Sequence, residues 1–196
     1  MKRVLSILLL MVMLFFLVGI NCFAGEDRES DTGGRLMVVI SGNFLSPADD
    51  GFRAIYSKGV FYPGLKAGYR ISRGFYLWAG YGFFSLKSET PVLKLDTKST
   101  QHFLSAGLGV MFPISPKLDY IGELGIFSGS YREESMGEVL KGSAPGLALN
   151  NGLLFYLNRT FYVELSLGYL TASDTVEDVK IKLGGLRTGL GLGFRF

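Results

Sequence analysis

Apolar and polar residues alternate along most of the chain from about residue 35, and clusters of turn residues interrupt the alternation. Side chains along a β-strand point alternately to opposite faces, so this pattern predicts strands. The predicted strands have about 11 to 14 residues, whereas ordinary globular strands have about 5 to 6 and a tilted membrane-crossing strand needs about 9 to 11. Eight such strands are predicted, at residues 35–45, 60–71, 75–86, 99–112, 117–130, 144–157, 160–171 and 183–196.

The connections between these strands alternate in length. Three are tight, at residues 72–74, 113–116 and 158–159, and four are longer and polar, at residues 46–59, 87–98, 131–143 and 172–182. Outer-membrane barrels with an even number of strands have short periplasmic turns and longer external loops. The alternation therefore predicts an all-β fold, an eight-stranded antiparallel transmembrane up-and-down β-barrel.

The two faces of the predicted strands differ sharply. One face of strand 99–112 carries Leu104, Ala106, Leu108, Val110 and Phe112, and the opposite face of strand 183–196 carries Arg187, Gly189, Gly191, Gly193 and Arg195. A soluble barrel would expose the glycine-rich face to water, which makes a poor solvated exterior. We therefore expect the apolar face to point outward into lipid.

The predicted interior contains charges of both signs. An eight-stranded barrel is only just wide enough for side chains to fill it, so glycines make room while acids and bases can pair. We predict a plugged polar interior with a charge network; the alternative is that the charges solvate a wet lumen. The network residues are Lys66, Arg70, Asp119, Glu123, Glu164, Arg187 and Arg195. Trp78 is predicted to lie on the same inward face, where its side chain is expected to fill space.

The N-terminus has the pattern of a secretory signal peptide. Met1-Lys2-Arg3 is followed by an apolar stretch over residues 4–20, and Ala24 offers a small residue for cleavage. We predict a cleaved signal peptide at 1–24, a flexible periplasmic linker at 25–34 and the barrel at 35–196. The alternatives are an uncleaved anchor and a lipoprotein acylated at Cys22. With cleavage after Ala24, the mature chain has no cysteine and hence no disulfide.

Composition excludes several classes of function. The chain has 48% hydrophobic residues but only one long apolar run, which argues against a helical membrane protein. The net charge of +3 falls to +1 without Lys2 and Arg3, which gives no indication of nucleic-acid binding. With one histidine and no mature cysteine, we predict no metal centre, and the period-two glycines form no phosphate-binding motif, so no cofactor is predicted. Acids in the loops, such as Glu133 and Asp174, are expected to be solvated rather than to hold calcium.

Three segments, at residues 63–70, 75–83 and 189–196, resemble the outer membrane protein β-barrel domain family, the OmpA-like and opacity-protein-like small barrels. The resemblance extends over residues 35–196 and is one of pattern, without a catalytic motif. It implies the cell outer membrane as location, reached by export through the inner membrane, and a structural or adhesin-like surface role. The implied partners are outer-membrane lipid and lipopolysaccharide, a surface ligand at the long loops, and the outer-membrane assembly machinery, for which Phe196 is the expected assembly signal.

Two other functions stay open as alternatives, a small-solute channel and a lipid A-modifying enzyme that uses His102. Thr100 lies two residues before His102, Ser105 lies on the opposite face, and Glu89 or Asp96 could orient the ring. The lipid A deacylases, which this chain resembles in size, have a serine two residues after the histidine, where this chain has Leu104. We therefore predict that the protein is not an enzyme.

The remaining expectations concern the first long loop and the strand ends. Asp49 and Asp50 precede Phe52, Ile55 and Tyr56, which predicts a short capped helix packed against the loops rather than an exposed hook. Aromatic residues gather at both ends of the predicted strands and are expected to form girdles at the two membrane interfaces. The turn-side girdle is Tyr69, Phe75, Phe112, Tyr120, Phe155, Phe161 and Phe196, and the loop-side girdle is Phe61, Phe83 and Tyr169.

Overall fold

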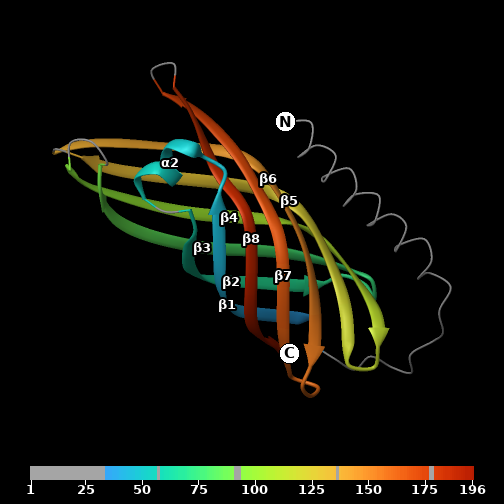
Figure 1. Ribbon diagram of the computed structural model, residues 1–196. Coiled ribbons are helices and arrows are strands. Elements are labelled where there is room, and N and C mark those ends of the chain that lie inside the picture. The colour runs from blue at the N-terminus through green and yellow to red at the C-terminus, as the bar shows by residue number, and fades with distance from the viewer. Residues whose placement is uncertain (1–33, 57, 91–93, 136, 177–178) are drawn as a thin grey trace. The chain divides into compact units, whose positions relative to one another are not determined.

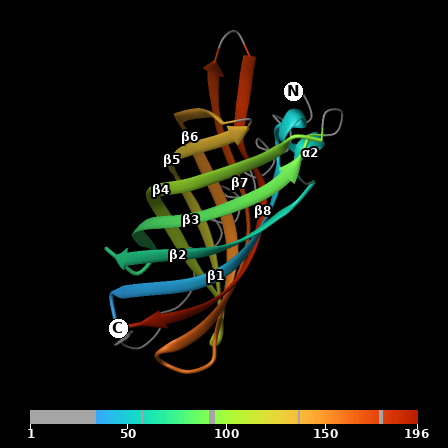
Figure 2. The ribbon, with the colours of Figure 1, turned by 90° about the vertical axis from the view of Figure 1, so that its left-hand side faces the viewer.

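A computed structural model describes residues 34–56, 58–90, 94–135, 137–176 and 179–196. These residues form a closed antiparallel barrel in which each strand pairs with its neighbours in sequence and β1 pairs with β8 (Figures 1 and 2). The elements are β1 Leu36–Pro47, α2 Asp50–Ile55, β2 Val60–Arg70, β3 Phe75–Glu89, β4 Asp96–Ser115, β5 Leu118–Ser135, β6 Glu138–Tyr156, β7 Phe161–Val176 and β8 Val179–Arg195. The predicted fold class is confirmed, whereas the predicted signal peptide and the linker up to residue 33 lie outside the described residues.

The strand register closes the barrel with a fixed stagger. The stagger can be followed from strand to strand by stepping from each residue to its direct partner on the next strand. The residues met on the way are apolar, and their side chains point outward. The path runs through Leu36, Tyr69, Leu77, Leu108, Leu124, Leu149, Tyr169 and Leu186, and returns to β1 at Ser46. The return point lies ten residues beyond the starting Leu36. A stagger of this kind requires the strands to tilt by roughly 35–45° from the barrel axis.

The outer surface of the barrel is apolar and exposed, and the inner surface is buried. Ile40, Leu104 and Leu190 are each about 60% exposed, while the neighbouring inward residues Val39 and Phe103 are nearly fully buried. Exposed apolar surface that encircles a molecule is unfavourable in water and favourable in lipid. The predicted orientation, with the apolar face outward, is thus confirmed. No helix in the described part of the chain is long and apolar enough to cross a membrane.

Three of the four predicted long loops are wrong, because the strands continue through them. The β3–β4 ladder extends to Glu89↔Asp96, the β5–β6 ladder to Ser135↔Glu138, and the β7–β8 ladder to Val176↔Val179. Apart from Val139 on β6, the side chains that face outward on these extensions are mostly polar. The apolar alternation that marks a half-buried strand therefore ends, although the backbone ladder continues. At about 3.3 Å per residue and a tilt near 40°, β5 rises about 45 Å, whereas an apolar band is about 25 Å tall.

Two seams divide the outer part of the barrel wall. The β2–β3 ladder stops at Gly64↔Gly82 and the β6–β7 ladder stops at Gly146↔Ala172. A proline stands immediately beyond each stop, Pro63 on β2 and Pro145 on β6, and proline has no N–H to donate to a ladder. Between these stops and the hairpin tips, strands β3–β6 form one group and strands β7, β8, β1 and β2 form the other. Figure 1 shows the β7–β8 hairpin apart from the ends of β3–β6.

Helix α2 forms as predicted and packs at the barrel mouth. The Asp49 side chain accepts a hydrogen bond from the N–H of Phe52 at 2.9 Å, which caps the helix. The Phe52 ring lies 6.1 Å from the ring of Phe84 on β3, and Ser88 of β3 donates to the Ile55 carbonyl at 2.6 Å. A second Asp49 oxygen accepts from the N–H of Lys182 on β8 at 3.0 Å. The helix therefore joins the two groups of strands.

Candidate functional site

The outer part of the lumen is filled by aromatic rings. Phe103 of β4 lies 5.6 Å from each of the rings of Tyr62, Phe84 and Phe127, and all four side chains are at most 5% exposed. Sequence reasoning assigned the inward face to small and charged residues and missed this cluster. The sequence did contain a signal for the cluster, because each of these aromatic residues lies an even number of positions from the small and charged residues of its strand and therefore shares their face.

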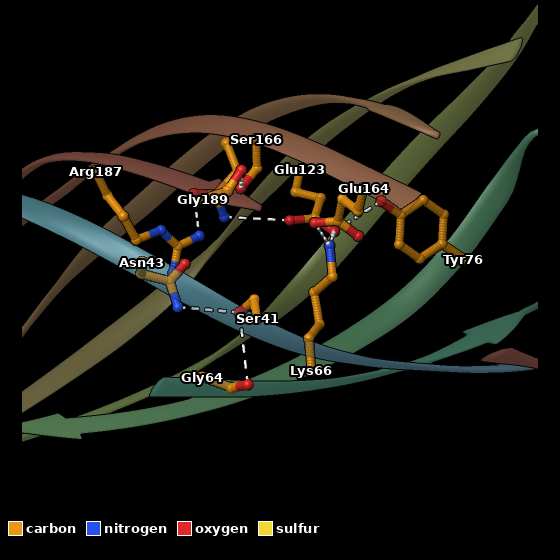
Figure 3. Close-up of polar contacts among 11 residues, drawn as sticks. Ser41, Asn43, Gly64, Lys66, Tyr76, Glu123, Glu164, Ser166, Arg187 and Gly189 are labelled. Atoms are coloured by element: carbon orange, nitrogen blue, oxygen red, sulfur yellow. Dashed lines mark hydrogen bonds and ion pairs between the residues drawn. The ribbon is translucent and has the colours of Figure 1, made fainter. Parts of the chain in front are cut away.

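The middle of the lumen contains a buried ion cluster. The Lys66 ammonium lies 2.7 Å from a carboxylate oxygen of Glu123 and 2.7 Å from one of Glu164 (Figure 3). Glu123 also accepts hydrogen bonds from the Tyr76 hydroxyl at 2.8 Å and from the Asn150 amide at 3.2 Å. Glu123 is 1% exposed. The cluster links strands β2, β3, β5, β6 and β7 across the barrel interior.

Arg187 joins this cluster indirectly. Its guanidinium donates to the Asn150 carbonyl oxygen at 2.6 Å, and Asn150 in turn donates to Glu123. Nearby, the Asn43 amide donates to Ser41, which contacts the Gly64 carbonyl (Figure 3). Sequence reasoning did not single out Asn150, although its place on the small and polar face of β6 was the available signal.

The other three predicted lumen charges lie nearer the turns, around Tyr156. The Tyr156 hydroxyl donates to Asp119 at 2.7 Å, and the Arg195 guanidinium lies over the Tyr156 ring, 5.0 Å from its centroid. Arg70 lies at this end as well, with a guanidinium nitrogen 3.9 Å from the Met111 sulfur. All seven predicted charged residues thus point into the barrel, at two levels of the lumen.

Two small cavities lie between these levels. Cavities of about 40 Å³ and about 10 Å³ lie beside Lys66, the first toward Tyr62 and Arg187 and the second toward Tyr76 and Met111. A water molecule needs roughly 10–15 Å³ of such volume. These two cavities can therefore hold a few waters beside the ion cluster.

The aromatic residues of the predicted girdles point outward. On the turn side, Tyr69, Phe75, Phe155, Phe161 and Phe196 are between 38% and 64% exposed, and on the loop side Phe61 and Phe83 are 73% and 45% exposed. Trp78, by contrast, is 4% exposed and donates its indole N–H to the Leu108 carbonyl at 3.2 Å. Phe196 pairs with Leu36, whose carbonyl accepts from the Phe196 N–H at 2.9 Å, so it lies where the last strand closes onto the first.

His102 lies on the outer wall rather than in a pocket. Its Nδ1 is 2.7 Å from the Tyr81 hydroxyl, and the centroid of its ring lies 6.1 Å from the ring centroids of Tyr81 and of Phe83, which are 6.2 Å from each other. The Thr100 hydroxyl is engaged with Ser85 at 3.0 Å. Within the described residues no carboxylate hydrogen-bonds to His102, so the structure does not assemble the nucleophile, base and acid of a triad.

The tips of two hairpins surround an open cleft. It has a volume of about 1070 Å³ and is lined by charged residues of β3, β4, β5 and β6, namely Lys87, Glu89, Asp96, Lys98, Glu134 and Glu138. Among the described residues, no group of three or more histidines, cysteines or acids is placed to hold a metal ion. The cleft therefore offers charged groups of both signs to a ligand outside the barrel.

A side-chain contact spans the β6–β7 seam beyond the apolar belt. The Tyr131 hydroxyl of β5 donates to Asp174 of β7 at 3.1 Å. It passes Gly142 of β6, where a Cβ would collide with the Tyr131 ring and with Asp174. Burial, followed by the hydrogen bond to Asp174, raises the pKa of Tyr131 to about 12.

The comparisons with known proteins show the fold. A scan against protein-family models and a search of curated proteins found no match. Among solved structures, the outer membrane protein OprG of Pseudomonas aeruginosa is 16% identical with a TM-score of 0.61, over 84% of this chain and 97% of that one. Ail, the attachment invasion locus protein of Yersinia pestis, is 22% identical with a TM-score of 0.54, over 83% and 99%. Neisserial surface protein A is 17% identical with a TM-score of 0.53, over 84% and 98%.

These similar structures include one complex. Ail has also been solved with the heparin analogue sucrose octasulfate, and that structure is 21% identical to this chain with a TM-score of 0.53. The chain therefore has the fold of small eight-stranded outer-membrane barrels, and it spans nearly the whole length of each of them.

Proposed function

We propose that the protein is an integral barrel of the cell outer membrane with a structural or surface-interaction role. The observation that carries the proposal is the closed ladder with exposed apolar residues all around it. Backbone groups pair within such a ladder wherever it is continuous, as it is between all eight strands on the turn side of the two seams, and paired backbone is the condition for strands in lipid. The fold shared with OprG, Ail and neisserial surface protein A supports the same location.

The surface role rests on the extended hairpins. They continue beyond the apolar belt as paired strands, and their tips present charged side chains around the cleft of about 1070 Å³. A ligand outside the cell would meet these tips first, and the sulfated sugar bound to Ail shows that a barrel of this fold can bind a ligand. The aromatic rings and the ion pairs inside the lumen support a role at the surface rather than the passage of solutes.

Electrophoresis of the outer-membrane fraction tests the proposal. A closed barrel resists detergent until it is heated, so we expect unboiled and boiled samples to migrate differently. The same band should stay with the membrane after alkaline carbonate extraction. Recovery of the protein from the soluble periplasm, with equal mobility before and after boiling, would contradict the proposal.

Surface labelling tests which end faces outward. An epitope inserted after Gly137, at the tip of the β5–β6 hairpin, should be detected by antibody on intact cells. The same epitope inserted between Asn158 and Arg159, in the β6–β7 turn, should be detected only after permeabilisation. We further propose that Phe196 is the assembly signal; Phe196→Ala should then lower the amount of heat-shifted protein in the outer membrane without changing the amount synthesised.

A further inference from the structure

Basic side chains form a row on the outer wall of strands β3 to β6. Lys87 pairs directly with Lys98, and Arg132 pairs directly with Lys141. All four have the outward parity of the apolar belt on their strands, and they are exposed or half-exposed. We call Lys87, Lys98, Arg132 and Lys141 the basic row.

The basic row follows the edge of the apolar belt. Lys87 and Lys98 lie four residues beyond Phe83 and His102 on their strands, and Arg132 and Lys141 lie six residues beyond Ile126 and Leu147. At about 3.3 Å per residue, and with long flexible stems, these side chains reach the level of lipid headgroups.

Acidic side chains lie farther out on the same four strands. Glu89, Asp96 and Glu134 each lie two residues beyond a member of the row, and Glu138 lies three residues beyond Lys141. The charges are thus sorted by distance from the belt, with the cations next to it and the acids at the tips.

The row places like charges directly opposite each other on two strand pairs, while on a third pair Lys98 lies opposite Glu134. Like charges directly opposite each other in an antiparallel ladder destabilise it, and the row contains two such pairs. Arg132 has a partner, since its guanidinium lies 2.6 Å from Glu134. Lys87, Lys98 and Lys141 make no ion pair within the described residues. An anion placed against the row would relieve the repulsion.

We propose that the basic row binds the phosphate groups of an outer-leaflet lipid, with the acyl chains of that lipid on the apolar belt below. Lysine binds phosphate as a point charge and arginine binds it through paired N–H groups. The position of the row at the belt edge favours a membrane lipid over a free anion, because the lipid can occupy both surfaces at once. This inference rests on the proposed membrane location.

Binding to diphosphoryl lipid A tests the inference on the folded barrel in detergent micelles. A ligand that binds only the folded state raises the temperature at which the heat-dependent band shift occurs, so that midpoint reports affinity. We expect the double variant Lys87→Gln/Lys98→Gln to weaken binding about tenfold or more. The matched control Lys117→Gln/Arg159→Gln, which removes two exposed cations at the turn end, should change it less than about twofold.

A variant of opposite sign separates binding from a structural effect. Glu134→Gln removes the carboxylate that engages Arg132, and we expect it to tighten lipid A binding while the double lysine variant weakens it. Equal affinity in all variants would overturn the inference, as would an equal midpoint rise with inorganic phosphate or with phosphatidylcholine at the same concentration. A protein without any heat-dependent band shift would instead contradict the proposed function, because no membrane barrel would have formed.

Discussion

Lys66 is the residue on which the interior of the barrel depends most. It is the cation placed between Glu123 and Glu164, and both carboxylates are nearly fully buried. A buried pair can be close to neutral for stability, but removing one partner leaves uncompensated charge and costs about 3–5 kcal/mol. We expect Lys66→Met to lower the free energy of unfolding by about this amount, measured by urea titration of the barrel in detergent micelles.

Restoring neutrality provides the control for this substitution. In Lys66→Met/Glu164→Gln one cation and one carboxylate are removed together, and Glu123 keeps Arg187, which it reaches through Asn150, as its counter-charge, so most of the lost stability should return. If the single variant and the double variant were equally unstable, packing of the lysine stem rather than its charge would explain the loss.

Tyr131 carries a pH dependence that can be worked out from its contacts. Its pKa is raised to about 12, from about 10 in an unfolded chain, so its neutral form is favoured in the fold. The stability that it contributes is therefore complete below about pH 10 and is lost as the pH rises to about 12. The absorbance at 295 nm that the wild type shows and Tyr131→Phe lacks reports the Tyr131 phenolate, and it should appear with a midpoint near pH 12. When the same comparison is made in the Asp174→Asn background, the midpoint should lie at a lower pH. An unchanged titration in Asp174→Asn would show that the hydrogen bond has no influence on Tyr131.

At the scale of elements, the two seams make a prediction about backbone dynamics. Residues 138–145 of β6 lie beyond the last β6–β7 pair, so every second amide points to the seam instead of to β5. We expect these amides to exchange hydrogen much faster than their neighbours that bond to β5. Amides of β4 and β5 in the paired segment Gln101↔Tyr131 to Thr97↔Ser135 provide the control, because they lie inside a continuous ladder. Uniform slow exchange along β6 would mean that the seam is closed in solution.

The elements also show where sequence reasoning succeeds and where it stops. The membrane part of each strand was predictable, because one face must be apolar and the other must fit inside a narrow barrel. The hairpin extensions were not, since a ladder such as Lys87↔Lys98 has polar residues on its outer face and gives no apolar alternation. The seams were also missed, although Pro63-Gly64 and Pro145-Gly146 mark both of them. A proline in a strand indicates an edge only when the neighbouring strand and its register are known.

For the whole molecule, the alternation of apolar and polar residues predicts the barrel fold. Which side chains meet inside the lumen depends on the register between neighbouring strands. The seven charges of the inward face were identified from parity alone. Their division into one group around Lys66 and another around Tyr156 depends on the stagger of ten residues, which decides what lies at the same level. The aromatic cluster around Phe103 belongs to the same problem, because four rings from four strands meet only in the closed barrel.

The side chains that point into the lumen lead to a prediction about the electrical behaviour of the whole barrel. The aromatic cluster, the ion cluster and the turn-side charges succeed one another along the axis, with cavities of about 40 Å³ and about 10 Å³ beside Lys66. A hydrated ion needs a continuous water path, and cavities of this size hold single waters or small groups of them. We therefore expect no steady conductance from the purified barrel in planar lipid bilayers under conditions in which a porin control conducts. Reproducible current steps of one size would contradict the plugged interior and make the small-solute channel the better account, because the ion cluster would then have to open a path past Glu123 and Glu164.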